Sequence, residues 1–196
     1  MFTTEAFTAF SQPHKLPIMA TTEVTTPSTT SLADIGLLIL RIGVGAAMIR
    51  AGLRKAFDFG TVVAFMESGG WRLPRFAAFM VTAAETAGGI GLLFGLLTPL
   101  AACVVIAAMI DAWAVNVSGA AFWSDPFNVP FVIAVGAAAL LFTGAGGYSV
   151  DARIFGNWRF GVRVAVGLLV VAIAAALLTW ILLNGVNPIH FTGPAA

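Results

Sequence analysis

Charged residues are scarce in this chain: Lys, Arg, Asp and Glu make up 10% of its 196 residues. A soluble globular domain usually contains about 25% charged residues. Hydrophobic residues make up 59% of the sequence, and the mean hydropathy is +0.96. The composition therefore predicts an integral membrane protein. The formal net charge of +1 gives no indication of a nucleic acid partner.

Cysteine and histidine are almost absent, with one cysteine, Cys103, and two histidines, His14 and His190. A single thiol cannot form an intramolecular disulfide or a dithiol relay. Both histidines lie outside the apolar segments, which excludes an intramembrane histidine pair that ligates haem. Any redox role would therefore need a bound cofactor or a partner protein.

The first 31 residues lack the apolar core of a secretory signal. The stretch Thr21–Ser31 is rich in Thr and Ser, which is typical of a flexible polar tail. A segment that becomes ordered on a partner is the alternative.

Five apolar segments follow, and most are close to the roughly 20 residues that a helix needs to cross a ~30 Å hydrocarbon core. Their length and the lack of strict alternation favour helices over strands. The fourth is short. The second and third are separated by almost no loop and should form a tight hairpin. The predicted segments are Leu32–Leu53, Phe76–Leu97, Pro99–Val117, Pro130–Phe142 and Phe160–Leu183.

The connection at residues 54–75 mixes basic residues with aromatic ones. This composition predicts an interfacial segment at the lipid headgroups that contains a half-buried short helix. The alternative is a lid over a site among the helices.

Three ionisable residues lie well inside the apolar segments: Arg41, Glu85 and Asp111. An uncompensated charge at the centre of a membrane helix costs about 2.5–3.5 kcal/mol on insertion scales. Counting 1.5 Å per residue from the helix ends places the three in one layer of the bilayer. Gly88 and Gly89 lie beside Glu85 and would let a neighbouring helix approach closely. We therefore predict a buried ion network with Arg41 as the cation.

Such a network has two interpretations. Polar residues can hold membrane helices together without any chemistry. An intramembrane carboxylate can also mark a site for a substrate, a quinone or a proton. The sequence leaves both open.

Three stretches contain motifs that are informative as a set. The first, LLILRIGVGAAMIRAGLRKAFDFG (Leu37–Gly60), has an early Arg in its helix and then a Gly, two residues and a Lys. The second, ETAGGIGLLFGLLTPLAA (Glu85–Ala102), has an acid, glycines and the hairpin. The third, GAGGYSVDARIFG (Gly144–Gly156), has a Gly-rich turn before Ser and Asp.

With these three stretches the chain resembles the DoxX-like family of membrane proteins. The resemblance implies a four-helix membrane fold and membrane-linked redox chemistry. Similar proteins include a subunit of a thiosulfate–quinone oxidoreductase and a methylamine-utilisation membrane protein. Carried over position by position, Arg41, Gly52, Lys55 and Glu85 match recurrent residues of the family. Where many relatives have His before the Gly of the first motif, this chain has Ala51.

The predicted fold is all-α and polytopic: a DoxX-like four-helix transmembrane bundle plus a fifth, C-terminal transmembrane helix in a bacterial plasma membrane. The predicted function is a quinone-linked membrane component of a redox system. In it Glu85, Arg41 and Asp111 are the catalytic candidates, and Lys55 and Gly52 are the cofactor-binding ones. Arg41 and Lys55 would orient a polar headgroup, and Glu85 and Asp111 would handle protons. The alternatives are a non-catalytic assembly or anchor subunit that docks through the fifth helix and the N-terminal tail, and a transporter of a small solute or lipid. The predicted divisions are residues 1–31, 32–156, 157–184 and 185–196.

Overall fold

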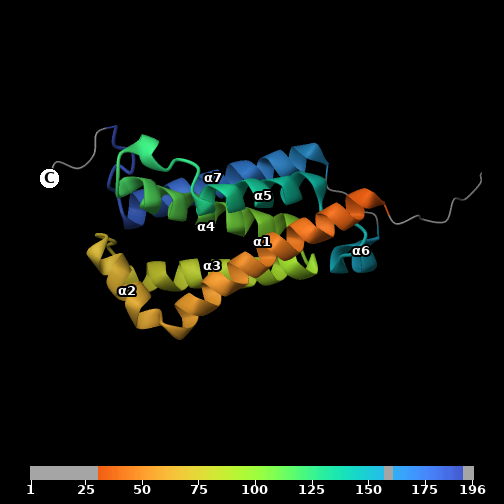
Figure 1. Ribbon diagram of the computed structural model, residues 1–196, viewed down its shortest axis with the longest axis horizontal. Helices are drawn as coiled ribbons and strands as arrows, with labels where there is room; N and C mark the ends of the chain where they lie inside the picture. Colours follow the sequence, from red (N-terminus) through yellow and green to blue (C-terminus); the bar gives the residue numbers. More distant parts are fainter. Residues whose placement is uncertain (1–30, 157–160, 192–196) are drawn as a thin grey trace, which may run out of the picture.

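The computed structural model describes residues 31–156 and 161–191, and these residues form helices and turns without strands. The predicted N-terminal tail therefore lies outside the described residues, except for Ser31. Five long helices are joined by shorter ones, as Figure 1 shows. The elements are α1 (Leu32–Phe57), α2 (Phe59–Ser68), α3 (Pro74–Phe94), α4 (Thr98–Ser118), η1 (Phe122–Ser124), α5 (Val129–Thr143), α6 (Val150–Phe155) and α7 (Val162–Leu183).

Four of these helices, α1, α3, α4 and α7, are long and apolar enough to cross a membrane. The fifth, α5, is apolar but has 15 residues and so is about 22 Å long. It corresponds to the segment that the sequence already showed to be short. The predicted all-α polytopic membrane fold is confirmed.

The bundle has α3 between α1 and α4, while α4 also contacts α5 and α7. In Figure 1, α4, α5 and α7 lie together, and α1 crosses α3 on the other side of the molecule. All five long helices contribute to one apolar core. Its buried members include Val44, Met48, Leu92, Ala102, Val105, Met109, Ala137, Leu140 and Ala172.

The contact between α1 and α3 depends on glycines at the crossing. A Cβ atom at Gly45 would lie 2.8 Å from the backbone nitrogen of Leu93, and one at Gly52 would lie 2.7 Å from that of Thr86. On α3, a Cβ at Gly89 would lie 2.8 Å from the backbone nitrogen of Ile49. Real Cβ atoms do not approach backbone this closely, so the two helices need glycine here to pack at this distance.

The predicted hairpin between the second and third apolar segments is confirmed, with a connection of three residues. Gly95 ends α3 in the left-handed conformation at φ 64°, and Leu97 is also left-handed at φ 47°. The backbone N–H of Leu96 donates to the carbonyl of Gly91 at 2.8 Å, which satisfies an unpaired group at the helix end. Pro99 lies in the first turn of α4, where its missing N–H is not needed.

The predicted short helix in residues 54–75 is also present. Helix α1 continues to Phe57, and α2 then runs across one end of the bundle (Figure 1). Met66 of α2 is buried together with Trp71 and Ala78. An apolar helix across the end of a membrane bundle fits the interfacial interpretation.

Helix α7 is part of the bundle. Its buried residues, Ala165, Ala172, Ala176 and Trp180, lie on the face toward α4. Its C-terminal end is fastened to the turn before α3, because the backbone N–H of Arg72 donates to the carbonyl of Leu183 at 2.7 Å. The Arg72 guanidinium also donates to the carbonyl of Leu182 at 3.3 Å.

The glycine crossing predicts that Gly89→Ala lowers stability by about 1–3 kcal/mol, because the added methyl group forces α1 and α3 apart. Gly43→Ala, also in α1, is the matched control, because nothing lies within 4 Å of a Cβ at Gly43. The measurement is the thermal unfolding midpoint of the purified protein in detergent. Equal midpoints for the two variants would contradict the importance of the crossing.

Candidate functional site

The central feature of the candidate site is an ion pair between α1 and α3. The Nζ atom of Lys55 donates to Oε2 of Glu85 at 2.6 Å. Glu85 is 3% exposed and Lys55 is 29% exposed, so the carboxylate is buried while the lysine connects it to the surface. Within residues 31–156 and 161–191 this is the one ion pair at salt-bridge distance.

The glycine crossing brings this pair together. Gly52 lies one helical turn before Lys55 and contacts Thr86, the residue after Glu85. The lack of a side chain at Gly52 lets α3 approach α1 closely enough for the lysine to reach the carboxylate. The Oγ1 atom of Thr86 is buried and has no hydrogen-bond partner in the described part of the chain. Three of the five predicted site residues, Gly52, Lys55 and Glu85, are therefore together.

Arg41 lies elsewhere, in the N-terminal half of α1. Its side chain is 1% exposed, and its Nη2 atom donates to the backbone carbonyl of Tyr148 at 2.5 Å. Its Nη1 atom occupies the space that a Cβ at Gly95 would fill. Nε and Nη1 are buried without a hydrogen-bond partner among the described residues. Gly95 thus makes room for the guanidinium at the end of α3.

The predicted network with Arg41 as the cation is wrong, because Arg41 and Glu85 contact different parts of α3. Arg41 is level with Gly95, which is ten residues, or about 15 Å, from Glu85 along the helix. The depth count assumed that both helices begin at the membrane surface and run parallel to its normal. Instead, α1 crosses α3 obliquely (Figure 1), and Lys55 near its C-terminal end reaches the carboxylate.

Asp111 lies on α4 and has no contact with the Lys55–Glu85 pair at hydrogen-bond distance. The hairpin register, in which Gly88 faces Val105, places it within about one helical turn of the depth of Glu85. That part of the depth prediction agrees with the structure. Asp111 is half-buried, and its Oδ1 atom has no hydrogen-bond partner in the described residues.

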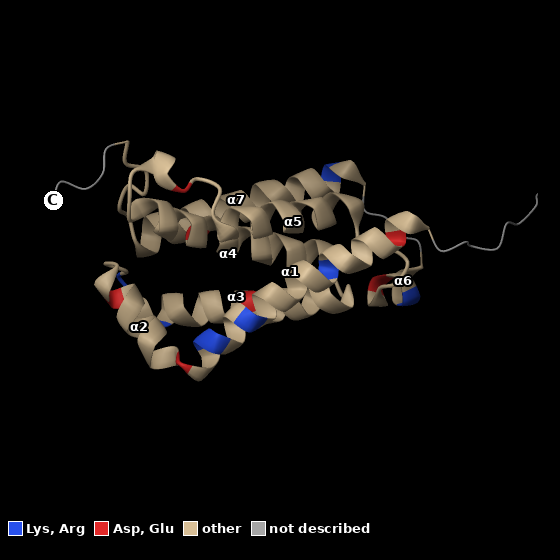
Figure 2. Ribbon diagram, in the orientation of Figure 1, with Lys and Arg blue, Asp and Glu red and all other residues tan. Residues whose placement is uncertain are grey.

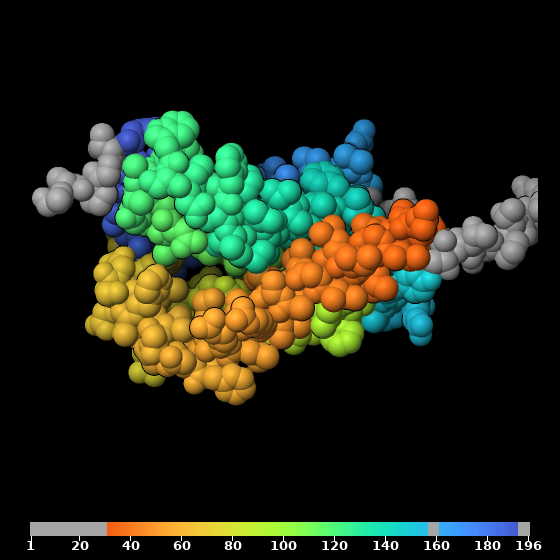
Figure 3. Space-filling view, in the orientation of Figure 1, coloured from red at the N-terminus to blue at the C-terminus, as the bar shows by residue number. Residues whose placement is uncertain are grey.

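The charges are distributed unevenly over the bundle (Figure 2). They lie along α1, on α2 and α6 and near several helix ends, and two acids, Glu85 and Asp111, lie inside α3 and α4, while α5 has none. The space-filling view shows a hollow between α2, the C-terminal half of α1 and α5 (Figure 3). Lys55, near the end of α1, is the partly exposed member of the buried pair.

Comparison with known proteins gives the family. The DoxX family model matches residues 36–119. The inner membrane protein YqjF of Escherichia coli (strain K12) is 30% identical over 129 residues, which are 65% of this chain and 98% of the relative. The chain belongs to the DoxX family. No solved structure matches it significantly.

The family match and the apolar helices show that this DoxX protein is a bacterial integral membrane protein of the plasma membrane. The matched range contains all five predicted site residues. It ends before the described helices α5, α6 and α7.

Asp151, which the sequence did not mark as functional, fixes the turn between α3 and α4 of this DoxX protein. The two carboxylate oxygens of Asp151 accept from the backbone N–H groups of Leu97 at 2.7 Å and Thr98 at 2.8 Å. Its own N–H donates to the carbonyl of Gly95 at 2.9 Å. Asp151 thus caps α4 and holds the left-handed turn. The sequence feature that could have pointed to Asp151 is the Gly-rich stretch before it, which ends in Ser149, the N-cap of α6.

A second acid, Asp34, fixes the Gly-rich stretch itself. Its Oδ1 atom accepts from the backbone N–H of Gly147 at 2.8 Å. The carbonyl of Tyr148, the next residue, accepts from Arg41. The two residues of α1 therefore hold one loop, which makes a structural role the simplest explanation for Arg41.

The ion pair predicts a specific pattern in a double-mutant cycle. Lys55→Met should destabilise the protein by about 3–5 kcal/mol, because it leaves the buried carboxylate without its cation. The double variant Lys55→Met/Glu85→Leu should recover most of that loss, because no buried charge remains. Unfolding of the four proteins in detergent measures the coupling. Additive effects would contradict a direct interaction between the two side chains.

The cap predicts that Asp151→Ala lowers stability by about 1–2 kcal/mol, since two backbone N–H groups at the start of α4 lose their acceptor. Asp125→Ala is the control, because that exposed side chain has no hydrogen bond to another described residue. Thermal unfolding compares the two. If both variants unfold at the parental temperature, the cap does not stabilise the hairpin.

Proposed function

We propose that this DoxX protein is the membrane component of a quinone-linked redox system, that it acts with a partner enzyme, and that the Lys55–Glu85 pair handles its protons. The observation that carries the proposal is the geometry of the pair: a carboxylate 3% exposed and bonded to a lysine 29% exposed. A buried carboxylate with one partly accessible partner can exchange a proton with a bound molecule. The family resemblance to a thiosulfate–quinone oxidoreductase subunit supports the same choice.

The chemistry assigns separate tasks to the chain and its partner. Reduction of a quinone to a quinol takes two electrons and two protons. With one cysteine and two histidines, the chain is poorly equipped to carry the electrons, so the partner enzyme supplies them. Lys55 donates a hydrogen bond to a quinone carbonyl oxygen and transfers its ammonium proton to that oxygen as negative charge develops there. The Glu85 carboxylate then accepts a proton from water and passes it to the neutral Lys55 amine, which restores the pair. Gly52 keeps the pair in position.

Arg41 and Asp111 have smaller roles in this proposal. Arg41 is fixed to the loop at the opposite end of α1, so it positions the bundle and does not contact the quinone. Asp111, with its unpaired Oδ1 at a similar depth to Glu85, is a second proton carrier on α4. The outward face of α7 is apolar and is the surface offered to the partner subunit or to lipid.

The decisive experiment is to purify the protein in a mild detergent and to analyse bound lipids and proteins by mass spectrometry. We expect quinone to be retained by the parent and lost from Lys55→Gln. Glu85→Gln should keep the quinone but lower quinone-dependent turnover with the partner by at least tenfold, since loss of a positioned acid typically has this effect. Glu67→Gln, an exposed carboxyl on α2, is the matched control.

The same preparation separates the alternatives. A partner protein retained without quinone, in the parent and in all variants alike, would favour the assembly or anchor subunit. Neither quinone nor a redox partner in the parent would overturn the proposal. A transporter would instead show solute or lipid uptake in vesicles that Glu85→Gln abolishes.

A further inference from the structure

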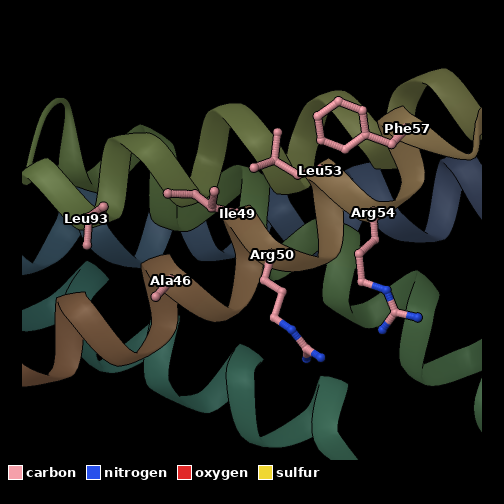
Figure 4. A pocket seen from close by; sticks show the side chains of 7 residues that line it. All are labelled: Ala46, Ile49, Arg50, Leu53, Arg54, Phe57 and Leu93. Carbon is pink, nitrogen blue, oxygen red and sulfur yellow. The ribbon is translucent and has the colours of Figure 1, made fainter.

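The outer face of α1 has a shallow groove that the proposed redox site does not use. Its volume is about 510 Å³. The floor is apolar and consists of Ala46, Ile49, Leu53 and Phe57 of α1, with Leu93 of α3. Figure 4 shows these side chains along the helix, with Arg50 and Arg54 projecting from one edge. The apolar floor matches the hydrocarbon chain of an amphiphile, and the two arginines at the edge match an anionic headgroup.

The two arginines have no partner within the described chain. Both are exposed, and neither guanidinium takes part in an ion pair or a hydrogen bond there. They are four residues apart, so they lie on the same side of α1 and repel each other. An anion between them would remove this repulsion. Lys55 differs, because Glu85 already neutralises it on another side of the helix.

The position of the arginines along α1 fits a lipid headgroup. Arg50 and Arg54 lie seven and three residues before the end of the helix at Phe57, or about 10 and 5 Å from it. Long arginine side chains near a helix end extend toward the headgroups. The apolar floor continues in the other direction as far as Ala46, about 16 Å from the helix end. The two arginines thus lie in the half of the groove nearer the interface, and the apolar floor extends past them to Ile49 and Ala46, deeper in the bilayer.

We propose that this groove binds an anionic phospholipid, with its phosphate between Arg50 and Arg54 and an acyl chain along Ala46, Ile49 and Leu53. Guanidinium groups bind phosphate through paired, charge-assisted hydrogen bonds. Two unpaired cations select an anionic headgroup over a neutral amphiphile such as a quinone. The site is independent of the quinone proposal, because it lies on a different side of α1 from the ion pair.

The test is native mass spectrometry of the full-length protein in nanodiscs made from mixtures of phosphatidylglycerol and phosphatidylcholine. The parent should retain one phosphatidylglycerol in preference to phosphatidylcholine. Arg50→Gln/Arg54→Gln should bind it about 30-fold more weakly, on the basis of the usual contribution of two surface cations. Ala46→Phe should also reduce retention, because its ring fills the apolar floor while both arginines remain.

The control is Arg75→Gln/Arg163→Gln, which removes two exposed charges outside the groove and gives the same net charge. It should retain phosphatidylglycerol as the parent does. An equal loss in both double variants would show a general charge effect and overturn the site. Equal retention of the two lipids by the parent would also overturn the site. A dimer that the groove variants dissociate would overturn it as well, because a second copy of the chain would then cover the groove.

Discussion

The close approach of α1 and α3 is the constraint on which the rest of this structure depends. Gly45 and Gly52 on α1 face α3, and Gly89 on α3 faces α1, each in a place where a methyl group would meet backbone. Apolar side chains gain little from leaving lipid for protein, so membrane helices depend on close packing. Here that packing also brings Lys55 within hydrogen-bond distance of Glu85. The ion pair is therefore a product of the glycines.

Charge is handled differently at two places in the bundle. Near the middle of α3, Glu85 is neutralised by a side chain of opposite sign. Beyond the C-terminal end of α3, Arg41 is held by a backbone carbonyl, and Asp151 by backbone N–H groups at the start of α4. A charge that is bound to backbone dipoles fixes a turn, whereas a pair of side chains can exchange a proton or a partner. This contrast is why the proposed chemistry is placed at Lys55 and Glu85.

The helices could be predicted from the sequence, whereas the side-chain contacts between helices could be predicted only in part. Long apolar stretches and a Thr98–Pro99 hairpin depend on local properties, and these were confirmed. Which cation meets Glu85 depends on the crossing angle of α1 and α3, which no local pattern records. The family resemblance named Gly52 and Lys55 as recurrent residues, but it did not predict that Lys55 contacts Glu85. Asp151 was missed because its partners are backbone groups about 50 residues away.

The attachment of α7 to the turn before α3 has a consequence for how the protein is made. Arg72 and the carbonyl of Leu182 are 110 residues apart in sequence, so this contact cannot form until Leu182 has been synthesised. Chains emerge at about 5–20 residues per second, which leaves the α1–α3 half in the membrane for several seconds before α7 arrives. The glycine crossing between α1 and α3 needs only residues of this early half, so it is a contact that can form during that interval. The bundle is completed when α7 packs on α4 and its C-terminal end binds Arg72.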